Sequence, residues 1–334
     1  MVLLKDIARK AGVSISTVSF VLNGKDKEMR ISTGMAKKIK EVALQEGYQP
    51  NQVAVSLRTG KSKIIGLLVD TISGSFFASL ALIIEREAET FGYKVIYCST
   101  GNEIKKGKEL IRILHQSQVD GYIIIPTEGM ENGIKELLSE KKPVVLMDSY
   151  FTGTPAPYVL VNNFSGTASG ISHLIKKGYK KIGFVCNDLQ LVQMHDRKRA
   201  YIDTLAANNI RLKKQWIVET KYKSPKEEVI KHITSFIQSV KPDAIMFAAN
   251  YLGVYGLESI RNLNLTIPDN IAVVCFDDHE LFNLYPPGIT SIRQPVEDIA
   301  KTAVHILMDE INGHKKVKQQ QVQLEARMIE RNST

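Results

Sequence analysis

Residues 5–24 read KDIARKAGVSISTVSFVLNG and contain two short helical segments separated by a glycine. The apolar residues that share one face of the first segment are Ile7, Ala8 and Ala11. Gly12 suits the positive φ of a tight turn, and Ser14 stands where the N-cap of the second segment belongs. Two helices joined by a tight turn that contains glycine are typical of the helix-turn-helix motif.

A third helix is expected from an N-cap at Ser32 to about Glu46, where Gly47 ends it. The three helices would form a small head with an interior of Ile7, Ala8, Val13, Val18, Val21, Leu22, Ile39 and Val42. The outer face of the second helix carries hydroxyl groups, on Ser14, Ser16, Thr17 and Ser19. Short hydroxyl side chains and a free helix N-terminus can approach phosphates and base edges closely.

The charge of the chain is concentrated in this head. Residues 1–63 hold 12 of the 44 Lys and Arg residues but only 5 of the 35 Asp and Glu residues, and the rest of the chain is nearly neutral. A basic head on a near-neutral body favours a nucleic-acid partner. The alternatives are a basic tail that only aids solubility and a plain helical bundle. The helix-turn-helix pattern and the charge together favour DNA binding.

The 334 residues suffice for about two domains. A composition of 44% hydrophobic, 24% charged and 7% aromatic residues is typical of a soluble globular protein. No apolar run approaches the roughly 18–20 residues of a membrane-spanning helix, and the N-terminus lacks the pattern of a signal peptide. Three widely spaced cysteines suit a reducing compartment and form neither a disulfide framework nor a CxxC metal pair. We therefore expect a cytoplasmic protein.

After residue 63, short apolar runs alternate with amphipathic segments, which indicates buried parallel sheets. The runs also repeat: IIGLLVD from Ile64 recurs as KIGFVCN from Lys181, GYIIIPT from Gly121 as DAIMFAAN from Asp243, and VVLMDS from Val144 as AVVCFDD from Ala272. The repeat predicts two similar doubly wound halves, whose ligand sites lie at the carboxyl ends of the strands. The polar residues expected in a cleft between the halves are Asp148, Asn250 and Asp277.

The stretch of residues 5–24, followed by EGYQPNQVAVSLRTGKSKIIGLLV at residues 46–69, resembles the head of the lactose repressor (LacI/GalR) family of bacterial transcription regulators. Downstream, the segments similar to the effector-binding core of that family are PYVLVNNFSGTASGISHLIKKGYKKIGFV, AIMFAAN, IAVVCFDD and PPGITSIRQPVEDIAKTA. The similarity runs from about residue 3 to about residue 330. It implies an all-α helix-turn-helix head and an α/β, two-lobed core like that of periplasmic binding proteins.

The resemblance also implies a division of the chain. The expected parts are a helix-turn-helix domain at 1–49, a hinge helix and linker at 50–63, and an effector-binding core at 64–334. Within the core, lobe 1 is expected at about 64–162 and 293–321, and lobe 2 at about 163–292 and 322–330. The hinge helix would form on operator DNA and insert into the minor groove.

Matched by position to the family, twelve residues are implied to contact DNA. The residues at phosphates or holding the recognition helix are Ser14, Thr17, Ser19 and Asn23, with further backbone contacts from Ser32, Tyr48 and Asn51. The base-reading positions are Ile15, Ser16 and Phe20, and the hinge positions are Ala54 and Leu57.

Eight further residues match the effector cleft of the family. The polar ones are Asp148, Arg197, Asn250, Asp277 and Gln294, and the aromatic ones that stack on a ligand ring are Phe76 or Phe77 and Tyr222. Paired donors and acceptors in fixed geometry suit the hydroxyl groups of sugars. The resemblance therefore implies a carbohydrate or a derivative as effector, with no cofactor and no metal.

The chain departs from the family at several positions. Leu3 replaces the usual Thr or Ser that opens the first helix, which removes a hydroxyl cap and a phosphate contact. Phe20 stands where Arg is common, so that apolar contact with a thymine methyl replaces an Arg–guanine pair. The loop at residues 24–31 is longer and basic, and Tyr251 replaces an acidic residue beside Asn250. The chain ends without a heptad helix for tetramer formation, so a homodimer is expected.

These features favour a dimeric, nucleoid-associated transcription regulator, most simply a repressor, that binds double-stranded operator DNA under the control of a small molecule. Two alternatives have different activities. A solute-binding protein shares the two-lobed core, but the basic head argues against it. A sugar-converting enzyme would need a nucleophile–base pair, a phosphate loop or a metal-spaced cluster, and the seven histidines are scattered. We therefore expect no enzymatic activity and no membrane partner.

Overall fold

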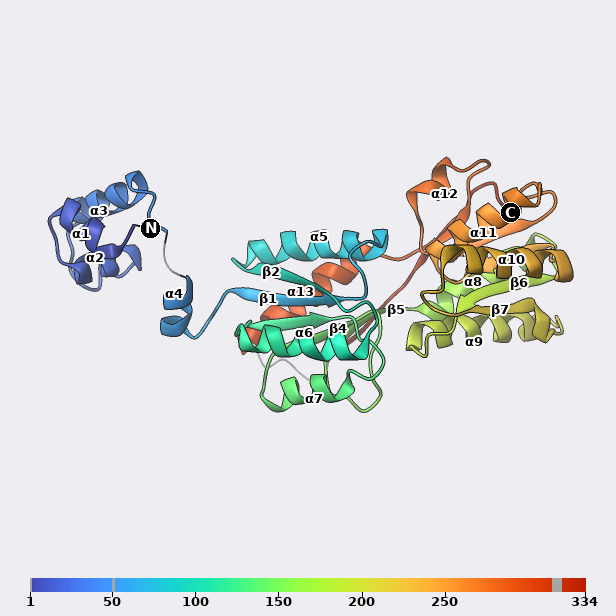
Figure 1. Cartoon of the computed structure of the whole chain (residues 1–334), viewed down its shortest axis with the longest axis horizontal. Coiled ribbons are helices and arrows are strands. Elements are labelled where there is room, and N and C mark those ends of the chain that lie inside the picture. Colours follow the sequence, from blue (N-terminus) through green and yellow to red (C-terminus); the bar gives the residue numbers. More distant parts are fainter. Residues whose placement is uncertain (1, 50–51, 314–319) are drawn as a thin grey trace. The chain divides into compact units, whose positions relative to one another are not determined.

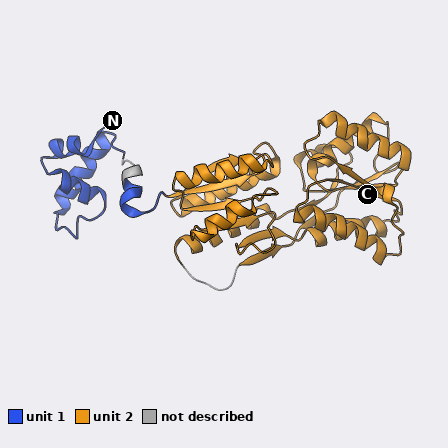
Figure 2. Ribbon diagram, turned by 60° about the horizontal axis from the view of Figure 1, so that its bottom comes forward, with its two compact units in different colours: residues 1–62 blue, residues 63–334 orange. Residues whose placement is uncertain are grey.

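The computed structural model describes residues 2–49, 52–313 and 320–334, and of residues 52–54 it describes the backbone alone. The chain divides into two compact units, residues 1–62 and residues 63–334 (Figure 2). Each unit has its own hydrophobic core and is described by itself.

The first unit is helical throughout. Its helices are α1 (Leu4–Ala11), α2 (Ile15–Leu22), α3 (Thr33–Gln45) and α4 (Gln52–Thr59). Gly12 has a φ of 74° between α1 and α2, and the Ser14 hydroxyl accepts the Thr17 N–H as an N-cap. Ser32 caps α3 in the same way through the Met35 N–H. The expected helix-turn-helix is therefore confirmed.

The core of the head differs slightly from the expected interior. The residues that are fully buried there are Ile7, Ala8, Ala11, Val18, Val21, Ala36, Ile39 and Ala43. Val13, Leu22 and Val42, which were expected inside, are only partly buried and pack on the rim of this cluster. Four of these eight residues are alanines, because three short helices that meet at close range leave limited room for larger side chains.

The second unit contains two six-stranded sheets with the same strand order. The first sheet runs β11-β5-β4-β3-β1-β2 and all its strand pairs are parallel. Its strands are β1 (Ile64–Val69), β2 (Lys94–Ser99), β3 (Gly121–Ile124), β4 (Val144–Met147), β5 (Tyr158–Val161) and β11 (Gln321–Leu324). The helices α5 (Ser75–Thr90) and α13 (Val296–Ile311) pack on one face, and α6 (Ile104–Gln116) and α7 (Glu131–Ser139) on the other (Figure 1).

The second sheet runs β12-β10-β9-β8-β6-β7. Its strands are β6 (Ile182–Asn187), β7 (Ile217–Thr220), β8 (Ala244–Phe247), β9 (Ala272–Phe276), β10 (Thr290–Arg293) and β12 (Arg327–Ile329). The helices α8 (Asn163–Lys176) and α9 (Val192–Ala207) cover one face, and α10 (Lys226–Val240) and α11 (Asn250–Asn262) cover the other. A 3₁₀ turn, η1 (Lys214–Trp216), precedes β7, and the short α12 (Glu280–Leu284) follows β9.

The sequence repeat is thus confirmed as a structural repeat, and the α/β fold class is as expected. One strand departs from the all-parallel expectation, because β12 pairs antiparallel with β10 at the edge of the second sheet. Edge strands accept such mixed pairing readily, since they bond on one side only.

The chain crosses three times between the sheets, and these crossings define two lobes. They follow β5, β10 and β11, so that α8 begins the second lobe and α13 returns to the first. The second and third crossings, after β10 and after β11, lie slightly later in the chain than the lobe boundaries expected from the sequence, which were 292/293 and 321/322. Arg293 still pairs in the second sheet, and β11 stays paired with β5 through Leu324.

No helix among the described residues combines the length and the apolar character that crossing a membrane requires.

Candidate DNA interface and effector pocket

The N-terminal turn of α2 presents exposed side chains. Ile15 is 52% exposed, and Ser16 is also exposed. An isoleucine at the start of a helix gains little by facing water, so this residue is available for apolar contact with a partner. The Ser14 hydroxyl is already shared with the backbone N–H and the hydroxyl of Thr17, at 3.1 and 2.8 Å.

The C-terminal end of α2 is held by a side-chain cluster. The Asn23 amide donates to the Ser19 carbonyl at 2.6 Å and to the Ser19 hydroxyl at 3.2 Å. The Arg58 guanidinium of α4 in turn donates to the Asn23 side-chain oxygen at 2.5 Å. Asn23 therefore links α2 with α4.

The remaining residues proposed to contact DNA are spread over the unit. Phe20 and Tyr48 are partly buried, and Tyr48 packs on the core of the head, whereas Ser32 is exposed and caps α3. Leu57 lies on α4 and is 74% exposed. Asn51 lies outside the described residues, and Ala54 lies in α4 without a described side chain.

The helix cap that is lost at Leu3 is partly replaced by a neighbouring side chain. Leu3 supplies no side-chain cap to α1, but the Asp6 carboxylate accepts the Leu3 backbone N–H at 3.0 Å. This contact satisfies a backbone donor just before the helix, although it adds a negative charge where the family carries a hydroxyl.

A pocket of about 470 Å³ lies between the two lobes of the second unit. All eight residues that the sequence assigned to the effector cleft line it: Phe76, Phe77, Asp148, Arg197, Tyr222, Asn250, Asp277 and Gln294. They come from both lobes and from segments up to about 200 residues apart, and the fold brings them together at the carboxyl ends of the strands.

Asp148 and Asp277 occupy equivalent places in the two lobes. Each comes directly after a buried strand, β4 or β9, and their φ angles are 65° and 67°. This left-handed conformation is uncommon for a residue other than glycine, although aspartate tolerates it. The repeated fold thus turns both carboxylates away from their strands in the same manner.

Arg197 is the buried cation of the pocket and is only 3% exposed. Its Nε donates to the Asn163 side chain at 2.8 Å, its Nη1 lies 3.4 Å from the Asp277 carboxylate, and its guanidinium lies over the Phe276 ring at 3.6 Å. The Gln294 amide donates to the other Asp277 oxygen. Arg197 and Gln294 together fix the orientation of Asp277.

The electrostatic environment of Asp148 is unfavourable for its ionised form. Burial raises the pKa of this carboxyl to about 6, with further increases from Asp277 and Asp70, while Arg197 acts in the opposite direction. One carboxylate oxygen accepts a hydrogen bond from the Gln193 amide of the other lobe at 3.1 Å.

Sequence reasoning missed other residues of this pocket, among them Asp70 and Gln193. Asp70 follows β1, is 8% exposed, and accepts a hydrogen bond from the hydroxyl of Tyr222. Burial raises the pKa of the Asp70 carboxyl, while the Tyr222 hydrogen bond and the charge of Lys223 oppose that rise. The sequence did contain a signal for Asp70, because it directly follows an apolar strand, as Asp148 and Asp277 do.

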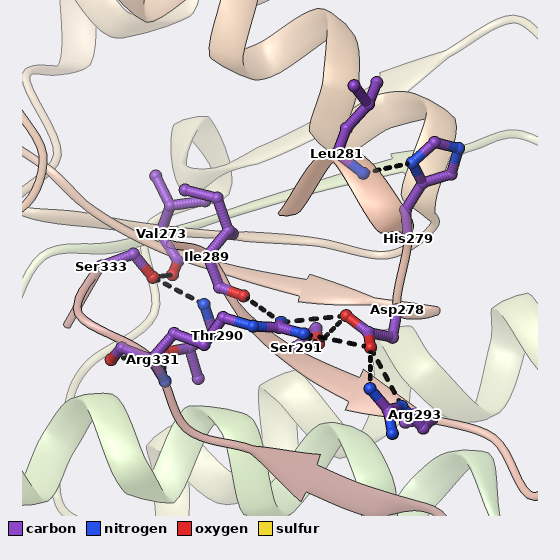
Figure 3. Close-up of polar contacts among 10 residues, drawn as sticks. All are labelled: Val273, Asp278, His279, Leu281, Ile289, Thr290, Ser291, Arg293, Arg331 and Ser333. Atoms are coloured by element: carbon purple, nitrogen blue, oxygen red, sulfur yellow. Dashed lines mark hydrogen bonds and ion pairs between the residues drawn. The ribbon is translucent and has the colours of Figure 1, made fainter. Parts of the chain in front are cut away.

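Asp278, the neighbour of Asp277, belongs to a separate cluster outside the pocket (Figure 3). Its carboxylate accepts hydrogen bonds from Arg293, Arg331 and Ser291. Burial would raise the pKa of Asp278, but the hydrogen bonds from Arg331, Ser291 and Arg293 outweigh burial and lower the pKa to about 2. Adjacent carboxylates that face different partners do not form a catalytic pair.

Two known families match this chain in agreement with its two units. Residues 3–51 match "Bacterial regulatory proteins, lacI family", and residues 171–334 match "Periplasmic binding protein-like domain". The chain is 31% identical over 314 residues to the ribose operon repressor of Haemophilus influenzae, with 94% of this chain and 93% of that protein covered. This chain belongs to the lacI family of bacterial regulatory proteins.

Another relative supports the same membership. The HTH-type transcriptional regulator RegA of Clostridium saccharobutylicum is 30% identical over 335 residues, with 99% of this chain and 98% of that protein covered. The lacI-family head and the helix-turn-helix favour a transcription regulator over a solute-binding protein. Among the residues that the structure describes, no group of three or more His, Cys, Asp or Glu side chains could hold a metal ion.

Solved structures show the same fold. A lac repressor dimer bound to operator and the anti-inducer ONPF aligns with a TM-score of 0.88 at 23% identity, over 100% of this chain and 99% of that one. A complex of the transcriptional regulator CelR with cellobiose aligns with a TM-score of 0.74 at 21% identity, over the whole of both chains. These likenesses concern the fold, while the family model and the sequence relatives make this lacI-family protein a DNA-binding transcription regulator with an effector-binding core.

Proposed function

We propose that this lacI-family regulator is a homodimeric, cytoplasmic repressor that binds a pseudo-palindromic operator and is released or recruited by a carbohydrate effector. The observation that carries the proposal is the pocket between the lobes. Eight residues matched to the family from scattered segments line one cavity that contains carboxylates, an arginine and aromatic rings. This combination suits a small ring that bears several hydroxyl groups.

The relatives agree with this class of ligand. The names and titles of similar proteins include a ribose operon repressor, a CelR–cellobiose complex and a lacI-type regulator complexed with D-xylulofuranose. The proposal includes no catalytic step, and it places the protein at the nucleoid because its ligand there is double-stranded DNA.

For the head, we propose that Ile15, Ser16 and Phe20 read bases, and that Ser14, Thr17, Ser19, Asn23, Ser32, Tyr48 and Asn51 position the backbone. Ala54 and Leu57 are proposed to enter the minor groove. The half-exposed Ile15 at the start of α2 supports this assignment, because about half of its apolar side chain faces solvent and is free for contact with a base.

The test is a DNA-binding titration at several salt concentrations with DNA from upstream of the gene itself. We expect retardation that weakens steeply as salt increases, because phosphate contacts release counterions. Ile15→Ala should weaken binding to this upstream DNA roughly five- to a hundred-fold, which is about the value of one specific base contact. Leu44→Ala is the matched control, since Leu44 is 83% exposed on α3 of the same unit. Equal losses in both variants, or no retardation at low salt, would contradict the proposal.

A further inference from the structure

Three aspartates line the pocket between the lobes, and its cations differ in burial. Asp70, Asp148 and Asp277 line it, whereas Arg197 is the buried cation among the described lining residues. Arg197 forms an ion pair with Asp277 at 3.4 Å. Within the described part of the chain, it forms none with Asp70 or Asp148. Asp70 and Asp148 are held instead by the uncharged side chains of Tyr222 and Gln193.

The other cations that line the pocket, Lys221 and Lys223, are exposed to solvent. Lys223 donates to the Gly101 carbonyl and lies 3.7 Å from the Glu103 carboxylate, so a carboxylate outside the cavity already offsets its charge. Its influence on Asp70 is secondary to that of burial. The interior therefore presents an excess of negative charge to whatever enters.

Three buried polar atoms of the pocket have no hydrogen-bond partner among the described residues, and all three are acceptors. Asp70 Oδ1, Gln193 Oε1 and Gln294 Oε1 are buried without a hydrogen-bond partner among the described residues. The three residues are 8%, 7% and 5% exposed, and all line the pocket. Each atom can only accept a hydrogen bond, and a buried acceptor without a donor is costly. A ligand that fills this cavity must therefore be rich in O–H or N–H donors.

We propose that the pocket takes a polyol without phosphate or carboxylate groups, and that Asp70 is the residue that sets this specificity. The inference rests on the proposed function, because it assigns a ligand class to the same effector pocket. Asp70 is the deciding group, since it is buried, it forms no ion pair with any of the described residues of the cavity, and it joins the two lobes through Tyr222. An anionic ligand would lie among Asp70, Asp148 and Asp277 in a cavity of low dielectric constant, where like charges repel strongly.

The experiment measures binding to the full-length protein by calorimetry and by the shift in unfolding temperature. The probes are matched pairs: ribose and ribose 5-phosphate, fructose and fructose 6-phosphate, and glucose and glucose 6-phosphate. For the pair whose sugar binds, we expect the phosphate to bind at least about a hundredfold more weakly. Asp70→Asn should reduce this ratio of the two dissociation constants, sugar phosphate to sugar, about tenfold. Asp203→Asn, the same change at an exposed position of α9, should leave it unchanged.

Three outcomes would overturn the inference. Tighter binding of a phosphorylated probe to the wild-type protein would contradict the ligand class and leave the proposed function intact. An unchanged difference in affinity between sugar and sugar phosphate in Asp70→Asn would remove Asp70 as the specificity residue, and Asp70→Ser provides the same test if Asp70→Asn does not fold. Binding of operator DNA without binding of any probe, by the wild type or the variants, would refute the carbohydrate effector and this inference with it.

Discussion

The Tyr222 hydroxyl of the second lobe donates a hydrogen bond to the Asp70 carboxylate of the first lobe. The two residues are 152 positions apart in the chain and meet over the effector pocket. The neighbouring Lys223 reaches the Gly101 carbonyl of the first lobe as well. The loop that follows β7 therefore joins the lobes through contacts that need no ligand.

Tyr222→Phe should shift the lobes toward an open arrangement. Removing a hydrogen bond to a charged group costs about 1.5–3 kcal/mol, which changes the ratio of closed to open forms at least about tenfold. Spin labels at Lys135→Cys on α7 and Lys231→Cys on α10, with Cys98→Ser, would report the distance between the lobes. Tyr251→Phe is the control, because the Tyr251 hydroxyl accepts from Asn187 within the second lobe. The same distances in both variants would show that the Tyr222 contact does not hold the lobes together.

Asp148→Asn should stabilise the ligand-free protein at neutral pH. Because the folded state raises the Asp148 pKa from 3.8 to about 6, it binds this proton more tightly than the unfolded chain does. The contribution of Asp148 to the free energy of unfolding therefore falls as the pH rises from about 4 to about 6, by roughly 3 kcal/mol. Denaturant titrations across this range should show this fall in the wild type and a smaller one in the variant, because burial also raises the pKa of Asp70. A variant that is less stable at pH 7 would contradict the assignment, while loss of effector binding is expected.

The cluster at Asp278 should have the opposite dependence on pH. Its pKa is lowered to about 2 in the folded protein, so its contribution is complete above about pH 4 and is lost as the pH falls toward 2. Arg331→Gln should lower the free energy of unfolding at pH 7 by about 1–3 kcal/mol. It should also weaken the acid dependence seen in thermal unfolding. Lys177→Gln, which breaks the exposed Lys177–Glu330 pair, should change stability by less than about 1 kcal/mol.

The parts of the structure that the sequence predicted are those encoded locally. Helix caps such as Ser14 and Ser32, and apolar strands ending in Asp148 and Asp277, depend on neighbours within a few residues. The resemblance to the family then supplied Arg197, Gln294 and the aromatic residues of the pocket. Each was assigned by its position within a motif and not by any contact.

The residues that escaped prediction depend on packing between distant segments. Gln193 reaches Asp148 across 45 residues and Tyr222 reaches Asp70 across 152, because the lobes meet there. Arg331 likewise bonds Asp278 across 53 residues. No periodicity in one segment reports such a pairing. The packing also shows that Arg197 supports its own lobe, so Arg197→Ala would lower stability as well as remove a ligand contact.

Phe20 should give this regulator a half-site that differs from those of relatives with arginine at this position. A phenyl ring has no hydrogen-bond donor and can contact a thymine methyl, so we expect A·T to be tolerated or preferred at the matching base pair. Selection of binding sites from a random DNA pool would measure the preference. Phe20→Arg should move the preference toward G·C. A guanine that is required by the wild type and is lost with Phe20→Ala would contradict this prediction.

Leu57 provides the sharpest test of how the head and the core communicate. It projects from α4, an eight-residue helix, and is 74% exposed, while Arg58 beside it holds Asn23 of α2. Helices shorter than about 12–15 residues are marginal in water, so we expect α4 to depend on operator DNA for most of its stability. If Leu57 of each subunit enters the minor groove, its contacts offset the cost of unstacking a base step. Leu57→Ala should then weaken binding to the operator at least about tenfold.

The same substitution should leave binding to unrelated DNA and the effector affinity of the protein nearly unchanged, because those depend on phosphate contacts and on the pocket. Leu44→Ala on α3 controls for the loss of an exposed leucine from the same unit. Titrations with operator and with scrambled DNA at one salt concentration separate the two contributions. Equal weakening on both DNAs would make Leu57 an ordinary linker residue. An order–disorder change of α4 could then not be the step that connects the effector pocket with operator recognition.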